Sequence, residues 1–112
     1  MAFQGVTPSK LAQNVLTTDY IAIYTVPANT RTYVKDICIC NTTSSNIDIS
    51  ISLVPSEGIP GTSNALYYEF TVDANETMQW KGSQIMYEND TIQVKASATG
   101  CTINIGGGEA TE

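Results

Sequence analysis

Strict alternation of apolar and polar residues between Ile47 and Leu53 is the feature that most limits what this chain can fold into. Every second residue of this segment is Ile or Leu, and Asp or Ser stands between them. Successive side chains of a β-strand point to opposite faces, so the spacing predicts a strand with one buried and one solvent-facing side. A helix would scatter the same apolar side chains around its axis.

The same period of two recurs along the chain. It is found in residues 66–72, 92–98 and 101–105, and the runs 20–26 and 32–41 are rich in Ile, Val and Tyr. Clusters of Asn, Asp, Ser and Gly between these segments predict turns, because these residues accept left-handed backbone angles or bond to nearby main chain. No window has the apolar spacing of an amphipathic helix.

Strands separated by turns at this spacing are typical of an all-β sandwich or barrel. The alternating faces must be buried against one another, so we predict one antiparallel, jelly-roll-like β-sandwich of about eight strands over residues 11–106. Residues 1–10 are expected to form an N-terminal arm, and the glycine-rich residues 107–112 a flexible C-terminal tail. The one long loop is predicted over residues 55–64 and has room to carry a contact surface.

Catalytic chemistry is not expected, because the chain contains no histidine. This removes the usual general base, the commonest metal ligand and any Ser-His-Asp arrangement. Cys38, Cys40 and Cys101 lack a fourth zinc ligand and are expected to pack as small apolar side chains. Acid pairs such as Glu69 and Glu76 are expected at the solvated surface. We therefore predict no enzyme activity, no cofactor and no metal site.

The charge of the chain limits its partners. Eleven acidic and five basic residues give a formal net charge of −6, and the basic residues are scattered along the sequence. Nucleic-acid binding needs a basic patch, so it is not expected. No apolar run approaches the ~20 residues of a membrane-spanning helix, and the N-terminus lacks the pattern of an export signal. We expect synthesis in a cytoplasm and no membrane contact.

Aromatic side chains are the best candidates for contact with a partner, because they supply interface anchors and sugar-stacking platforms. Tyr67 is the foremost candidate, since it falls on the polar face of its predicted strand beside Glu69. The other candidate partner-contact residues are Phe3, Trp80 and Tyr87.

Several turn-and-strand motifs resemble a pattern found in small β-sandwich structural proteins of tailed bacteriophages. These motifs are residues 24–30 (YTVPANT), 38–42 (CICNT), 65–70 (ALYYEF), 73–77 (DANET) and 87–94 (YENDTIQV). The resemblance covers about residues 12–106. It implies a non-enzymatic structural component of a bacteriophage virion, made in the host cytoplasm: a capsid decoration protein, a head-fibre module or a tail accessory.

The resemblance also implies partners. Such modules act as homo-oligomers, trimers among them, docked on a major capsid or tail protein. An arm such as residues 3–10 is expected to add a strand to the open sheet edge of a neighbour. One alternative stays open, a carbohydrate-binding module that recognises a bacterial surface polysaccharide, with Tyr67, Trp80 or Tyr87 stacking on sugar rings.

Overall fold

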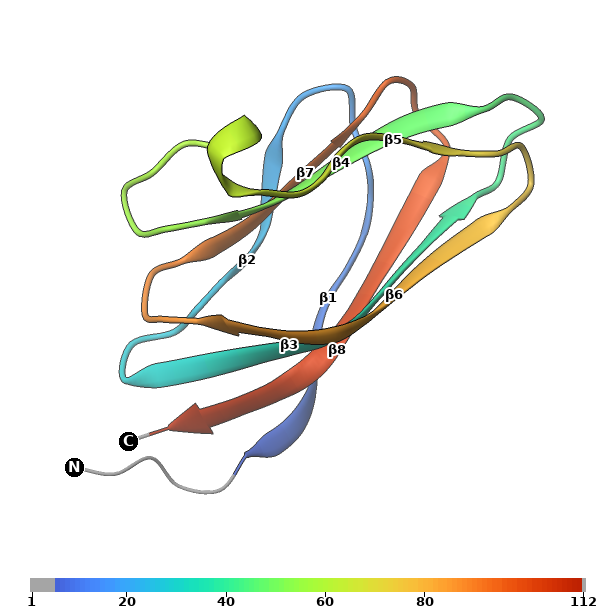
Figure 1. The fold of residues 1–112 in the computed structure, drawn as a ribbon. Helices are drawn as coiled ribbons and strands as arrows, with labels where there is room; N and C mark the ends of the chain where they lie inside the picture. Colours follow the sequence, from blue (N-terminus) through green and yellow to red (C-terminus); the bar gives the residue numbers. More distant parts are fainter. Residues whose placement is uncertain (1–5, 112) are drawn as a thin grey trace.

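The computed structural model describes residues 6–111, and strands account for most of them (Figure 1). The elements are β1 (Thr7–Val15), β2 (Ile21–Thr25), β3 (Thr30–Asn41), β4 (Ile47–Val54), the short 3-10 helix η1 (Thr62–Asn64), β5 (Ala65–Val72), β6 (Thr77–Met86), β7 (Thr91–Ala96) and β8 (Cys101–Thr111). Within this described range, no helix is long and apolar enough to cross a membrane.

The strands form two antiparallel four-stranded sheets. Sheet A has the order β1-β8-β3-β6 and sheet B the order β2-β7-β4-β5. The pairing is nested, because β1 pairs with β8, β2 with β7, β3 with β6 and β4 with β5. One long antiparallel ribbon that folds over itself in this way is a jelly roll. The predicted eight-stranded, jelly-roll-like sandwich is confirmed.

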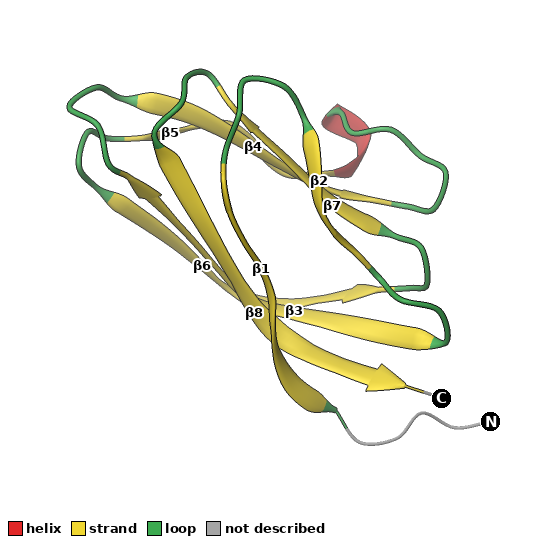
Figure 2. Cartoon of the chain, turned by 180° about the vertical axis from the view of Figure 1, so that it is seen from behind, coloured by secondary structure: helices red, strands yellow, loops and turns green. Residues whose placement is uncertain are grey.

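The hydrophobic core lies between the two sheets. Ile49 and Ile51 of β4 are fully buried, as are Ile103 and Ile105 of β8. Burial of one such side chain stabilises the fold by about 1.5–3 kcal/mol, so the alternating positions seen in the sequence carry much of the stability. The edge strands β5 and β6 lie on one long side of the sandwich, and β1 and β2 lie on the other (Figures 1 and 2).

Three turns contain an asparagine in the left-handed conformation, as the clusters of turn-forming residues in the sequence predict. Asn29, Asn75 and Asn89 have φ angles of 57°, 58° and 69°, in the left-handed region that asparagine tolerates better than most residues. Each stands in a cluster of turn-forming residues between two strands. The predicted turns around these three residues are therefore confirmed.

Asn41 ties two turns together at one end of the sandwich. Its side chain is fully buried, and Nδ2 donates to the carbonyl oxygens of Ser45 at 2.8 Å, Val72 at 3.0 Å and Asp73 at 3.3 Å. Its Oδ1 accepts from the backbone N–H of Thr43 at 3.0 Å and from the Thr43 hydroxyl at 2.8 Å. One amide thus holds the β3–β4 turn against the turn between β5 and β6.

The prediction of a flexible tail over residues 107–112 is wrong for residues 107–111, which belong to β8. The two glycines of this segment, Gly107 and Gly108, pair with β1 on one side and with β3 on the other. A Cβ added to Gly107 would lie 2.0 Å from the carbonyl oxygen of Tyr33, and one on Gly108 would lie 2.3 Å from Val6 Cγ1. At Gly107 glycine is required by the close approach of the backbone of β3. The absence of a side-chain pattern over these residues had suggested a tail.

The predicted N-terminal arm over residues 1–10 is corrected in part. Residues 7–10 are the first part of β1 and pair with residues 106–109 of the same chain. This segment therefore adds a strand to its own sheet, and β1 is an edge strand of sheet A. Residues 1–5 lie outside the described residues.

Candidate functional site

The outer face of sheet A carries an apolar patch. In β3 the alternation places Tyr33 outward, because its neighbours Thr32 and Val34 are fully buried. The cross-strand register puts Ile85 and Gly108 beside Tyr33, and Pro8 beside Gly108, in one row across the sheet. We call Val6, Pro8, Tyr33, Ile85 and Tyr87 the outer patch. Its three most exposed members are Val6, Ile85 and Tyr87, at 54%, 52% and 57%.

A groove of about 510 Å³ lies in this row. Its lining residues are Val6, Pro8, Tyr33, Lys35, Gly107 and Gly108. The groove exists because β8 has no side chains at its glycines, while β1 and β3 on either side of it do. The lining is mainly apolar and carries one amine. We call this hollow the glycine groove.

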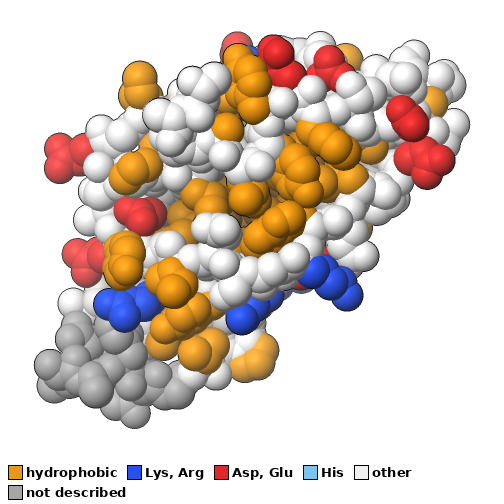
Figure 3. Space-filling model, in the orientation of Figure 1, with side chains coloured by type: hydrophobic (Ala, Val, Ile, Leu, Met, Phe, Trp, Pro, Cys, Tyr) orange, Lys and Arg blue, Asp and Glu red, His pale blue; other side chains and the backbone are white. Residues whose placement is uncertain are grey.

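Basic residues gather on the same face. Asp36 stands beside Lys81 and Gly106, and Gly106 stands beside Lys10, so these side chains share a row next to the outer patch. Arg31 lies on the outer side of β3, and Lys35 is exposed at an irregularity of that strand. In Figure 3 basic side chains flank the apolar patch along the lower sheet.

The charge of the chain is therefore separated between surfaces. Among residues 6–111, the outer face of sheet A holds four of the five basic residues and one acid, which gives it a charge of +3. The other described residues hold one basic and nine acidic side chains. An acidic protein with one apolar and basic face is suited to meet an acidic protein surface, because opposite potentials steer association and fix its register.

Tyr87 is held in place although its side chain is exposed. The guanidinium of Arg31 lies over its ring, with Cζ 5.0 Å from the ring centroid. Its backbone N–H donates to Asp90 Oδ2 at 2.9 Å, and the carboxylate of Glu88 accepts from the Asn29 N–H at 2.7 Å across the turn. An exposed ring fixed in this way loses little conformational freedom when a partner covers it.

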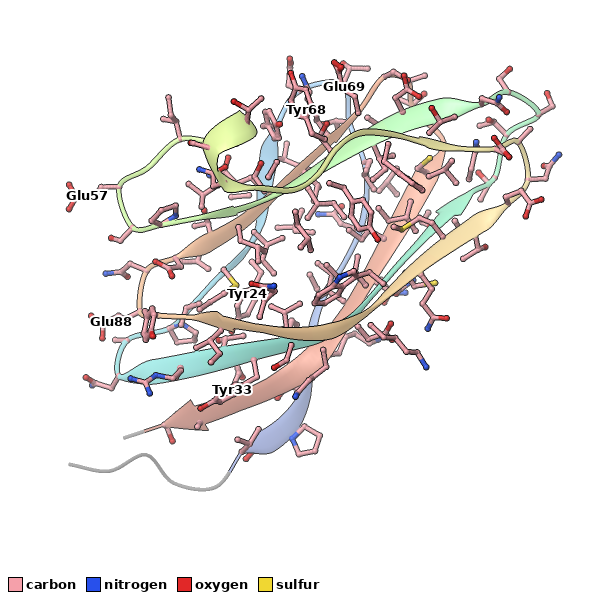
Figure 4. All side chains as sticks on the ribbon, viewed as in Figure 1. Tyr24, Tyr33, Glu57, Tyr68, Glu69 and Glu88 are labelled. Carbon is pink, nitrogen blue, oxygen red and sulfur yellow. The ribbon has the colours of Figure 1, made fainter. Side chains whose placement is uncertain are left out.

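The structure corrects the prediction for Tyr67. Tyr68 and Glu69 of β5 stand opposite the single residue Ser50 of β4, which makes a β-bulge. Glu69 has a φ of 50°, and its N–H donates to Ser50 Oγ at 3.0 Å. The extra residue reverses the phase of the strand, so Tyr67 packs against the core and Tyr68 is 51% exposed. Figure 4 shows Tyr68 beside Glu69 on sheet B.

The other predicted contact residues are not brought together. Trp80 packs against the core from β6, and its ring lies over Gly82, where an added Cβ would come within 2.7 Å of Trp80 Cζ2. Tyr87 belongs to the outer patch, where its ring contacts Arg31. Phe3 lies outside the described residues. Sequence analysis missed Tyr33, Ile85 and the gathered basic residues, because only the register between distant strands places them side by side.

The three cysteines occupy two environments. Cys101 is fully buried, and this burial, together with the neighbouring Cys40, raises the pKa of its thiol. Cys38 and Cys40 are half-buried on the outer side of β3, beside uncharged polar residues of β6 and β8. Among residues 6–111, no three Cys, His, Asp or Glu side chains come together in a way that could hold a metal ion.

A partly buried hydrogen-bond cluster joins the two sheets near the outer patch. The hydroxyl of Tyr24 on β2 donates to the carboxylate of Glu109 on β8 and lies 2.7 Å from the hydroxyl of Thr32 on β3. Burial raises the pKa of Tyr24 above its ordinary value of 10.0, and the hydrogen bond to Glu109 raises it further. The phenol therefore stays protonated in the folded chain at a pH where it ionises in the unfolded chain.

Raising the pH above 10 is therefore expected to destabilise the wild type more than the Tyr24→Phe variant. A folded-state pKa above the unfolded value gives stability that is complete below the unfolded pKa and is lost as the pH rises. Urea titrations of both chains between pH 8 and about pH 11.5 measure this difference. If the free energy of unfolding falls equally with pH in the two chains, the pKa of Tyr24 is not raised by folding.

Comparison with known proteins places the chain by its fold. No family model matches it, and no curated protein matches its sequence. Its structure is similar to a chain in the structure of the infectious bursal disease virus Gx strain, with a TM-score of 0.55 and 9% sequence identity. The likeness covers 96% of this chain and 32% of that one. It shows a shared fold and nothing more.

Two further solved structures match with lower scores. They are the infectious bursal disease virus Gt strain, with a TM-score of 0.45, and the infectious bursal disease virus VP2 subviral particle, with a TM-score of 0.44. Their sequence identities are 10% and 11%, and each match covers 95% of this chain. The chain spans about a third of the length of the solved chains it matches.

Proposed function

We propose that this protein is a non-enzymatic structural component of a virus particle and that the outer face of sheet A docks it on another protein of that particle. The observation that carries the proposal is the nested jelly roll, whose fold is similar to a chain of a virus structure over 96% of this chain. The jelly roll is a recurrent architecture of viral capsid domains. Fold alone does not assign function, so the exposed face supplies the second support.

The finer proposal is a bacteriophage virion: a capsid decoration protein or a head or tail accessory that forms a homo-oligomer, such as a trimer, on a larger shell. The motif resemblance to structural proteins of tailed bacteriophages supports it. The outer patch supports it too, because exposed aromatic and apolar side chains beside basic ones are typical of protein interfaces. The partner in this proposal is a major capsid or tail protein with an acidic surface.

The carbohydrate-binding alternative loses support from the side chains that it needs. Tyr67 and Trp80 are half-buried and pack against the core, which reduces the ring surface that either offers to a sugar. The ring of Tyr87 is covered on one face by Arg31. Stacking of a sugar on Tyr87 is therefore restricted to the other face.

Co-sedimentation with assembled particles tests the proposed function. The purified chain is expected to saturate capsids or tails of the phage that encodes it at a fixed stoichiometry, and light scattering is expected to show an oligomer. The variant Ile85→Asp, in the outer patch, is expected to bind particles at least tenfold more weakly, because it loses apolar burial and gains a charge of the wrong sign.

Tyr68→Ser is the matched control, because Tyr68 is equally exposed but lies on sheet B. It is expected to bind particles as the wild type does. A wild-type chain that stays monomeric and leaves both capsids and tails unbound overturns the proposed function. Equal losses in the two variants would instead contradict the choice of sheet A as the docking face.

A further inference from the structure

A single apolar side chain projects from the loop between β4 and η1. Ile59 is 81% exposed, more than any other large apolar residue of the described range. A side chain so far out of the core contributes little to the fold, and no residue of the loop 55–64 belongs to the outer patch. Its tip is therefore free to serve a contact with another molecule.

The loop that carries Ile59 is held by hydrogen bonds. Asn64 Nδ2 donates to the carbonyl oxygen of Ile59 at 2.9 Å, and Asn64 Oδ1 accepts from the Gly61 N–H at 3.1 Å. The Ser56 N–H donates to Asp90 Oδ1 at 2.9 Å, which fixes the start of the loop to the β6–β7 turn. Ile59 is thus presented in a preformed position, which lowers the ordering cost of binding.

The loop carries one charge, and it is negative. Glu57 is the only ionisable residue between positions 55 and 64, and Figure 4 shows its side chain pointing away from the body of the molecule. The loop tip therefore offers an apolar side chain with a carboxylate two residues before it. A complementary site would be an apolar hollow with a basic group at its side.

The glycine groove has these properties. It is mainly apolar, it has a volume of about 510 Å³, and Lys35 is among its lining residues. The face around it carries a net charge of +3, whereas the rest of the described chain is strongly acidic. Within one copy the loop follows a strand of sheet B, and the groove lies on the outer side of sheet A.

We propose that Ile59 of one copy inserts into the glycine groove of the next copy and that the carboxylate of Glu57 meets the amine of Lys35. The contact joins two different surfaces of identical chains, so it repeats from copy to copy and closes into a ring or extends along a shell. This inference rests on the proposed function and deepens it, because it names the surfaces through which copies of a particle protein meet.

Sedimentation equilibrium of single variants is the first test. Ile59→Ser is expected to weaken self-association at least tenfold, because burial of the side chain is lost. Glu57→Lys and Lys35→Glu are each expected to weaken it about tenfold, because like charges then face each other. The double variant that carries both reversals is expected to recover to within about threefold of the wild type, since the charge pair is restored.

Mixing two defective variants distinguishes this contact from a symmetric one. The Ile59→Ser chain keeps its groove, and a Tyr33→Asp/Lys35→Glu chain keeps its loop, so the mixture is expected to form a one-to-one dimer that stops growing. A symmetric contact made by one of these surfaces alone would give no such dimer. Tyr68→Ser is again the control, and thermal melts confirm that each variant is folded.

Two results overturn the inference. The first is that the Ile59→Ser chain and the Tyr33→Asp/Lys35→Glu chain self-associate as strongly as the wild type. The second is that the wild type stays monomeric at every concentration. The particle-binding assay separates this failure from failure of the proposed function. Wild-type chains that saturate particles without self-association disprove the loop-in-groove contact and leave the structural role standing.

Discussion

Replacing Gly107 by alanine is expected to lower the midpoint of thermal unfolding by more than about 10 °C. The added Cβ would lie 2.0 Å from the carbonyl oxygen of Tyr33, a backbone atom that is fixed in the ladder between β3 and β8. Overpacking against fixed atoms costs about 3 kcal/mol, and each 1 kcal/mol shifts the midpoint of a domain of this size by about 4 °C. Circular dichroism melts measure the shift.

Gly106→Ala is the matched control, because it stands next to Gly107 in the same strand. A Cβ on Gly106 would meet no heavy atom within 4 Å. The variant is expected to unfold at the wild-type temperature or slightly above it, since alanine also restricts the unfolded chain. Similar midpoints for the two variants would show that β8 does not pass as close to β3 as the structure has it.

Changing Asn41 to aspartate is expected to destabilise the fold by about 3 kcal/mol or more at neutral pH. The amide nitrogen donates to three carbonyl oxygens in a buried site, and a carboxylate oxygen in its place would face them without a proton. Leaving buried acceptors unsatisfied costs about 1–3 kcal/mol, and burial of an unpaired charge adds to this cost. Urea titration at pH 7 measures the change in the free energy of unfolding.

Asn46→Asp controls for the added charge in the same turn. Asn46 is exposed, and its Oδ1 accepts a hydrogen bond from the Ala74 N–H at 3.0 Å, which a carboxylate also accepts. This variant is expected to stay within about 0.5 kcal/mol of the wild type. If Asn41→Asp is equally mild, the buried amide does not join the two turns.

The fold could be predicted from the sequence because apolar and polar residues alternate along its strands. The isoleucines of β4 are buried against the opposite sheet, as their spacing predicts. The predicted solvent-facing side of this strand is wrong for Ser50 and Ser52, which are also buried. The glycines at the end of β8 gave no such signal, since a residue without a side chain shows no periodicity. Their role depends on the closeness of β1 and β3, which are remote in sequence.

The candidate site was harder to predict, for two physical reasons. A bulge at Tyr68 and Glu69 shifts the strand by one residue, and one residue is enough to exchange inward and outward side chains. The basic residues lie far apart in the sequence, and the register of three different strands makes them neighbours. The predicted structural role in a virion stays a proposal, as does its assignment to a tailed bacteriophage.

The nested pairing has a consequence for how the chain reaches its native state. β1 pairs with β8 alone in its sheet, so the first strand of the sandwich has no partner until the last strand has been synthesised. Pairing of such distant segments makes folding slow, in the range of milliseconds to seconds, because the chain must close its longest loop. During translation the growing chain therefore exposes an unpaired β1, and sheet A is completed only after β8 has been synthesised.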